Sequence, residues 1–444
     1  MPRTEPARGM RDFLPEDVRR REYVIGVIKR VYERYGFEPL ESPAVENLET
    51  LMGKYGDEGN QLIFKILKRG EHEATGQADL ALRYDLTVPL ARVVAQYQSR
   101  LPRLFKRYQI QPVWRADRPA RGRFREFYQC DVDSLGSMSP VVEAEVCSAV
   151  AEALVELGFS DFVIRMNHRQ LLASLLAAAG VPPDRHASAL VALDKLDKIG
   201  VDGVMKELAE RGLDDASREA LLSLFQSSAA EAVLDRVESV IGADPAGMSA
   251  LENVRAVLAL LPGTPAAGKI RIDPSLARGL SYYTGAIWEI TVADLPGSLG
   301  AGGRYDNLVG MFLGQNIPAC GFSLGLERIL VVMGERNMFP ASLAMTPADV
   351  MIATIDASSA PDALRLAAAL RGQGLRVLVY PDAGKIGKQI KYADGRRIPF
   401  VALLGEDEIK GGTVTVKDLA AQTQATYDQA KAGLAIRETL RQRG

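Results

Sequence analysis

The sequence predicts an α+β fold with a helical insertion and a C-terminal α/β domain, and three observations carry this prediction. Residues 80–133 are mostly short β-type runs around turn residues, and an amphipathic helix pattern follows them. Residues 168–261 are alanine- and leucine-rich, with helical periodicity and no strand signal. From residue 347 onward, apolar strand-like runs alternate with helix-like runs. Mixed elements of this kind, segregated along the chain, are typical of α+β and layered α/β domains.

The first half of the chain supplies two clear helices around the β-type runs. A helix is predicted over residues 15–35 from apolar residues at helical spacing, and it ends at Gly36. A strand-like stretch over residues 37–45 follows. A second helix is predicted over residues 140–157, where valine and leucine recur at the same spacing.

The insertion divides the sheet-forming sequence in two. Its helical segments break at residues 180–183, at Gly200 and at Gly242. Strand-like sequence resumes at residues 269–292, passes through the glycine-rich GSLGAGGRYDNLVG, and ends in the helix-like LGLERILVVM. We therefore expect a sheet domain over residues 1–167 and 262–337, the insertion over 168–261, and a third domain over 346–444.

Composition limits the class of protein. Hydrophobic residues make up 47% and charged residues 25% of the 444 residues, which is globular usage. No apolar run reaches the roughly 20 residues of a membrane helix, and the N-terminal stretch is too charged for a signal peptide. We expect a cytoplasmic protein without a membrane contact. The three cysteines and three histidines show no metal-ligand spacing, so no protein-bound metal is expected.

A formal net charge of −2 argues against non-specific coating of nucleic acid, so any such contact must be local. Basic residues do gather between Arg100 and Arg125, with Asp117 as the only acid between them. On charge alone, a solvated basic surface is the favoured interpretation. The cluster consists of Arg103, Lys106, Arg107, Arg115, Arg118, Arg121 and Arg123.

Three separated patches combine arginine with carboxylate and aromatic residues. In residues 115–133, two β-type runs flank the loop ADRPARGR, so Arg115 and Gln129 could lie across from one another on a hairpin. An arginine held on a strand suits a phosphate, because its planar fork donates two hydrogen bonds. In the second patch Arg278 precedes two tyrosines, and a surface cation beside ordinary strand residues is the alternative there.

The third patch joins a glycine-rich segment to a helix start. GAGGRYDNLVG does not fit the dinucleotide fingerprint, and a plain tight turn is the default interpretation of its glycines. Arg328 falls in the first turns of the predicted helix beside Gly325, where the helix dipole disfavours a cation unless an anion accompanies it. This position indicates a nucleotide phosphate or base nearby.

Taken together, these segments resemble the class II aminoacyl-tRNA synthetases, and specifically the histidyl-tRNA synthetase family, over nearly the whole chain. YGFEPLESPAVE resembles motif 1, a dimer-interface element, PVWRADRPARGRFREFYQCDVD resembles motif 2, and ACGFSLGLERIL resembles motif 3. These three motifs indicate the class alone. The amino acid is indicated by ARGLSYYTG and GAGGRYDNLVGMF, which resemble the two histidine signatures, and by LRYDLTVPLAR, which resembles the amino-group-binding segment. The tail from residue 384 onward is similar to the family's anticodon-binding domain.

The resemblance implies roles for six residues in binding histidine. Asp85 and Thr87 are expected to bind the α-amino group with the help of Gln129, because an ammonium in a partly dry pocket needs a carboxylate. Asp133 and Tyr283 are expected to recognise the imidazole, and Tyr282 to shape the pocket. Paired polar recognition of this kind rejects analogues strongly, because a wrong side chain leaves buried groups unpaired.

The resemblance also implies that three arginines act on ATP, which is a substrate that brings Mg²⁺ with it. Arg115 and Arg328 are expected at the α- and γ-phosphates, and Arg278 at the α-phosphate. Their role is electrostatic, because charge grows on the phosphate oxygens as the histidine carboxylate attacks. The chain departs from the family at Ser281, where an acidic residue is usual.

The family resemblance implies a homodimeric enzyme that activates histidine with ATP and transfers it to the 3′ end of tRNA(His), without a permanently bound cofactor. One alternative is a synthetase-like regulatory subunit of ATP phosphoribosyltransferase, but such relatives generally lack the C-terminal domain and the signature residues. A second alternative is a ligase of the same fold that forms an adenylate without tRNA. The C-terminal domain and the basic stretch of motif 2 argue against it.

Overall fold

The computed structural model describes residues 4–70, 75–193, 195–225, 233–242, 244–277, 282–340, 343 and 346–443. The chain divides into two compact units. The larger unit comprises residues 1–14 and 20–338, and the smaller one comprises residues 15–19 and 339–444. No helix of the described residues is long and apolar enough to span a membrane.

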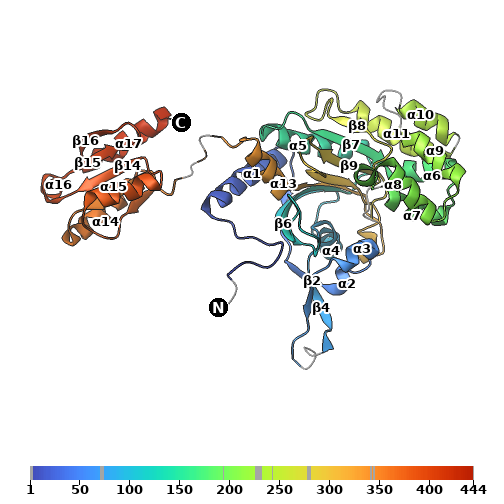
Figure 1. The fold of residues 1–444 in the computed structure, drawn as a ribbon, viewed down its shortest axis with the longest axis horizontal. Helices are drawn as coiled ribbons and strands as arrows, with labels where there is room; N and C mark the ends of the chain where they lie inside the picture. Colours follow the sequence, from blue (N-terminus) through green and yellow to red (C-terminus); the bar gives the residue numbers. More distant parts are fainter. Residues whose placement is uncertain are drawn as a thin grey trace. The chain divides into compact units, whose positions relative to one another are not determined.

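A largely antiparallel sheet is the centre of the larger unit (Figure 1). Its strand order is β1-β5-β6-β11-β10-β9-β7-β8, and only the two edge pairs, β1 with β5 and β7 with β8, are parallel. The antiparallel α+β prediction is therefore confirmed. The strands are β1 (Glu38–Pro39), β5 (Phe105–Trp114), β6 (Glu126–Leu135), β7 (Val163–His168), β8 (Ile270–Ile272), β9 (Ala286–Thr291), β10 (Gly300–Arg304) and β11 (Ala319–Gly325).

A second, small antiparallel sheet has the order β2-β4-β3 and projects from the same unit (Figure 1). Its strands are β2 (Val45–Asn47), β3 (Lys65–Leu67) and β4 (Ala78–Leu82). Helices precede and follow these strands. They are α1 (Pro15–Arg34), α2 (Leu48–Leu51), α3 (Gly56–Gln61), α4 (Thr87–Tyr97), α5 (Pro140–Glu156), α12 (Gly310–Leu313) and α13 (Leu326–Glu335).

The helix predicted over residues 140–157 is α5, and it packs on β6 and β11. Ser139 caps it, because its hydroxyl accepts from the backbone N–H of Val141. Val142, Val146, Val150 and Leu154 are buried, as the spacing predicts. Glu143 is fully buried among them and forms an ion pair of 2.9 Å with Arg304 at the end of β10.

Two local expectations are wrong. The glycine-rich residues 300–304 form strand β10 rather than a tight turn, because β9 and β11 both pair with this backbone. Arg115 and Gln129 do not lie across from each other: Gln129 pairs with Gln111, whereas the N–H of Arg115 donates to the carbonyl of Arg125. The β5–β6 hairpin runs on past both strand ends, so the two residues lie four register positions apart.

The inserted segment is helical throughout its described residues, as predicted. It breaks where expected: Gly180, Gly200 and Gly242 all have positive φ, which a glycine adopts without strain. Its apolar faces form two cores of their own. The helices are α6 (Arg169–Ala178), α7 (His186–Leu193), α8 (Leu196–Glu210), α9 (Asp215–Phe225), α10 (Val233–Ile241) and α11 (Pro245–Ala259), with 3₁₀ helix η2 (Pro183–Arg185).

The smaller unit is the predicted α/β domain with a mixed five-stranded sheet in the order β13-β12-β14-β15-β16. Strands β13, β12 and β14 are parallel, and β15 and β16 add as antiparallel strands. The strands are β12 (Val350–Thr354), β13 (Val377–Val379), β14 (Phe400–Leu404), β15 (Thr413–Asp418) and β16 (Thr423–Asp428). The helices are α14 (Ala360–Gly372), α15 (Ile386–Gly395), α16 (Glu406–Gly411) and α17 (Gln429–Arg443), with 3₁₀ helix η3 (Ala357–Ser359).

The buried pair between α5 and β10 predicts the stability of two variants. Glu143→Ala leaves the buried guanidinium of Arg304 without its main partner, so we expect the free energy of unfolding to fall by about 3 kcal/mol. Glu145→Ala is the control, because the pair of Glu145 with Lys106 is partly exposed and contributes about 1 kcal/mol or less. Both tryptophans, Trp114 and Trp288, lie in the larger unit, so tryptophan fluorescence in urea reports its unfolding. Equal loss in both variants would contradict the assignment.

Candidate active site

A cavity of about 240 Å³ lies against the central sheet of the larger unit. It is lined by side chains of β6, β10 and β11, by the first turns of α4 and α13, and by the residues before β9. Arg278 and Ser281 lie outside the described residues. The other residues to which the resemblance gave a role in binding histidine or ATP all line this cavity, namely Asp85, Thr87, Arg115, Gln129, Asp133, Tyr282, Tyr283 and Arg328.

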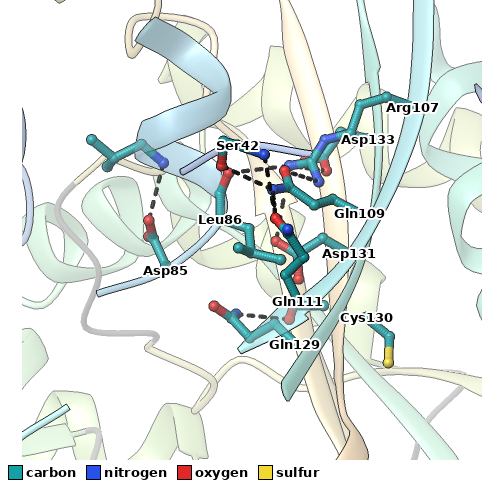
Figure 2. Close-up of polar contacts among 12 residues, drawn as sticks. Ser42, Asp85, Leu86, Arg107, Gln109, Gln111, Gln129, Cys130, Asp131 and Asp133 are labelled. Atoms are coloured by element: carbon teal, nitrogen blue, oxygen red, sulfur yellow. Dashed lines mark hydrogen bonds and ion pairs between the residues drawn. The ribbon is translucent and has the colours of Figure 1, made fainter. Parts of the chain in front are cut away.

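Strand β6 presents a row of polar side chains to the cavity. Successive strand residues point to opposite faces of a sheet, so Gln129, Asp131 and Asp133 share one face. All three are buried and line the cavity. Figure 2 shows Cys130, which lies between the first two, pointing away from them. Two of the three have a side-chain oxygen without a hydrogen-bond partner among the described residues, namely Gln129 Oε1 and Asp131 Oδ1.

The buried guanidinium of Arg107 on β5 balances this row (Figure 2). Its Nη2 lies 2.8 Å from Oδ2 of Asp133 and 3.9 Å from Oδ2 of Asp131. Burial raises the pKa of both carboxyl groups, and the charge of Arg107 opposes this shift. The side chain of Arg107 is 0% exposed, so the expectation of a solvated basic surface is wrong for this residue.

Asp85 is held at the other wall of the cavity by three donors. Its Oδ1 accepts from the backbone N–H of Val88 and from the hydroxyl of Tyr55, each at 3.0 Å, and its Oδ2 accepts from the hydroxyl of Tyr282 at 3.3 Å. The side chain is buried, and burial raises its pKa, whereas the Val88 N–H and nearby Arg115 lower it. Thr87, the first residue of α4, lines the cavity beside it.

Arg115 and Arg328 bring positive charge to the same cavity. Nε of Arg115 donates to the carbonyl of Tyr84 at 3.0 Å, and the guanidinium stacks 4.3 Å from the centroid of the Tyr84 ring. Nη1 of Arg328, on the first turn of α13, donates to the carbonyl of Ser298 at 2.5 Å. These contacts fix both cations before any anion binds, which is the preorganisation that electrostatic catalysis requires.

Glycines make the room for these side chains. Gly321 on β11 lies opposite Asp133, and a Cβ there would lie 1.8 Å from Oδ1 of Asp133. A Cβ on Gly303 would lie 2.7 Å from the ring of Tyr283. Side chains at these positions would displace the groups that line the cavity, so glycine is required on steric grounds.

Four residues of the site were not assigned to it from the sequence: Arg107, which was placed in the basic cluster, and Asp131, Tyr305 and Ser323. The hydroxyl of Tyr305 donates to Oδ1 of Asp133, and Ser323 on β11 pairs with Asp131 across the sheet. The two-residue period of β6 could have indicated Asp131, because it lies between two chosen residues on the same face. The other three depend on the strand register, which the sequence alone does not give.

The arrangement suits a ligand that has both hydrogen-bond donors and anionic groups. Acceptors from Asp85 and β6 can receive the protons of an ammonium or a ring N–H, and the arginines can hold phosphate oxygens. Among the residues that the structure describes, no group of three or more histidine, cysteine or carboxylate side chains is arranged to bind a metal ion.

Comparisons with known proteins identify the family. The family model for histidyl-tRNA synthetase matches residues 9–329, and an anticodon binding domain model matches residues 349–439. A histidine–tRNA ligase from Cytophaga hutchinsonii is 41% identical over 442 residues, covering 95% of this chain and 97% of that protein. One from Gloeobacter violaceus is 41% identical over 459 residues, covering 98% of each.

Solved structures agree. The crystal structure of histidyl-tRNA synthetase from Nostoc sp. PCC 7120 superposes with a TM-score of 0.81 at 30% identity, covering 99% of this chain and all of that one. A structure titled as an ATP phosphoribosyltransferase regulatory subunit/histidyl-tRNA synthetase, from Bacillus halodurans, has a TM-score of 0.74 at 22% identity and covers 90% of this chain, which shows a shared fold alone. The chain belongs to the histidyl-tRNA synthetase family.

Proposed function

We propose that the cavity on the central sheet binds histidine and ATP side by side, and that the chain acts there as a histidine–tRNA ligase. The observation that carries this proposal is the meeting of buried acceptors on β6 and Asp85 with preorganised arginines in one cavity. The first step joins the histidine carboxylate to the α-phosphorus of ATP and releases pyrophosphate. In the second step a ribose hydroxyl at the 3′ end of tRNA(His) attacks the carbonyl carbon, and AMP leaves.

The histidine subsite is assigned to the acceptors. Asp85 receives the α-ammonium, with Thr87 and Gln129 as its neighbours, because an ammonium leaving water needs a charged partner. Asp133 receives a ring N–H of the imidazole, and Tyr283 fixes the other ring nitrogen. Three contacts support this division: Tyr305 and Arg107 each bind the Asp133 carboxylate, and the hydroxyl of Tyr282 donates to Asp85.

The ATP subsite is assigned to the arginines. Arg115 and Arg278 stabilise the α-phosphate, Arg328 stabilises the γ-phosphate, and Mg²⁺ enters with the nucleotide as part of the substrate. The histidine carboxylate is already ionised at neutral pH, so the first step needs no general base. The cations stabilise the charge that grows on the non-bridging oxygens, and positioning supplies the rest of the rate enhancement.

The roles of the domains are inferred from the family to which the chain belongs. We assign catalysis to residues 1–167 and 262–337, an insertion to residues 168–261, and anticodon binding to residues 346–444. Exposed cations on α15 and in the turn after it give the last domain a local surface for tRNA phosphates. They are Lys388, Lys391, Arg396 and Arg397.

The chain forms a homodimer in this proposal, through the segment around Pro43. It acts in the cytoplasm, where tRNA is charged. The regulatory-subunit alternative is disfavoured because the chain keeps an anticodon binding domain. The tRNA-independent ligase is disfavoured for the same reason.

The function is tested by pyrophosphate exchange into ATP with each of the twenty amino acids. We expect exchange with histidine alone, dependent on Mg²⁺, and transfer of histidine to tRNA(His) when tRNA is added. Exchange with a different amino acid, or no exchange with any amino acid, would refute the assignment.

The arginine assignment is tested by Arg115→Ala. Loss of one preorganised donor to a charged transition state typically lowers kcat by about two orders of magnitude or more, and we expect that loss in pyrophosphate exchange. Arg103→Ala is the matched control, because Arg103 belongs to the same basic cluster but is exposed and outside the cavity. If Arg115→Ala kept the activity of the control, Arg115 would have no part in the mechanism.

A further inference from the structure

Asp131 occupies the middle of the β6 row, yet neither subsite of the proposed function uses it. Its side chain is 2% exposed and lines the cavity between Gln129 and Asp133. A buried carboxylate carries a large desolvation cost, so its retention calls for a physical reason. The contacts of its neighbour across the sheet supply one.

Ser323 on β11 pairs with Asp131 in the antiparallel register and contacts two residues of the row. Its hydroxyl accepts from Nε2 of Gln129 at 2.8 Å, and the carboxylate of Asp131 is the acceptor that faces it across the sheet. Gln129, Ser323 and Asp131 thus form a short polar chain along the floor of the cavity.

The protons in this chain can be arranged in only one way while Asp131 is ionised. A carboxylate has no proton to donate, and a serine hydroxyl has one. Ser323 must therefore donate its only proton to Asp131 and can only accept from Gln129. The amide of Gln129 must turn its NH₂ group to Ser323, which leaves Oε1 facing the cavity as an acceptor without a partner among the described residues.

We propose that Asp131 is a positioning residue, which acts through Ser323 to fix the amide of Gln129 with its oxygen toward the α-ammonium of bound histidine. The inference rests on the proposed function, because it takes the ligand to be histidine. A reversed amide would present two N–H donors to the ammonium and repel it. The Asp131 carboxylate therefore sets the orientation of the Gln129 amide, although Asp131 itself does not contact the ligand.

Arg107 opposes the protonation of Asp131, which would disable this arrangement. Its guanidinium lies 3.9 Å from Asp131 and 2.8 Å from Asp133, and it is itself fully buried. Burial raises the pKa of Asp131, whereas Arg107 and the Ser323 hydroxyl favour the ionised form. A protonated Asp131 could donate to Ser323 and reverse every hydrogen bond in the chain. The buried cation of Arg107 disfavours this protonated form.

A double-mutant cycle between Asp131→Asn and Ser323→Ala tests the proposal in pyrophosphate exchange. Either change frees the Gln129 amide to turn, so each should raise KM for histidine about tenfold, the value of a hydrogen bond to a charged group, with kcat little changed. The double variant should be no worse than either single variant, because both break the same chain. Additive effects would mean that Asp131 acts on the ligand directly, and would overturn the proposal.

Two ligands separate this role from a general effect on the pocket. Calorimetric titration of Asp131→Asn should show weakened binding of histidinol, which keeps the ammonium, and unchanged binding of imidazolepropionate, which lacks it. Equal weakening of both would overturn the proposal, and so would wild-type affinity for both.

Ser134→Ala is the control for altering strand β6, because Ser134 is buried on the opposite face and outside the cavity. It should keep the wild-type KM. A wild-type protein that fails to exchange with histidine would instead refute the proposed function, so the two failures are distinguishable.

Discussion

The buried ion pair of Arg107 with Asp133 is the interaction on which the rest of the pocket depends. The buried aspartates Asp85, Asp131 and Asp133 line one cavity, and Arg107 is the fully buried cation beside two of them. Without it, the two carboxylates on β6 would gain protons and lose the acceptors that a cationic ligand needs. The same guanidinium donates to the Leu86 carbonyl, next to Asp85, so it joins both walls of the proposed histidine subsite (Figure 2).

This cation belongs to a wider buried polar network that reaches the segment around Pro43. The Arg107 guanidinium donates to Gln109, and the amide of Gln109 donates in turn to the hydroxyl of Ser42 and to Gln111 (Figure 2). Satisfied networks of this kind make the position of each member depend on the others. The proposed dimer segment and the proposed histidine subsite thus share one continuous set of hydrogen bonds along β5.

The elements with strong apolar periodicity were predicted correctly from the sequence. Features that depend on strand register were not. Helix α5 and the alternating units after residue 347 were predicted because apolar spacing is a local property. Strand β10 was missed because glycines carry no strand signal, and only pairing with β9 and β11 makes them a strand. Arg107 was taken for a surface cation because charge alone cannot show burial. Its role follows from its ion pair with Asp133, which depends on the pairing of β5 with β6.

The most direct measurement is a crystal structure of the protein with histidine bound. The account predicts the α-ammonium within hydrogen-bond distance of Asp85 and of Oε1 of Gln129, with a ring N–H of the imidazole donating to Asp133. A histidine whose imidazole lies against the arginines, or whose ammonium lies away from Asp85 and Gln129, would contradict it.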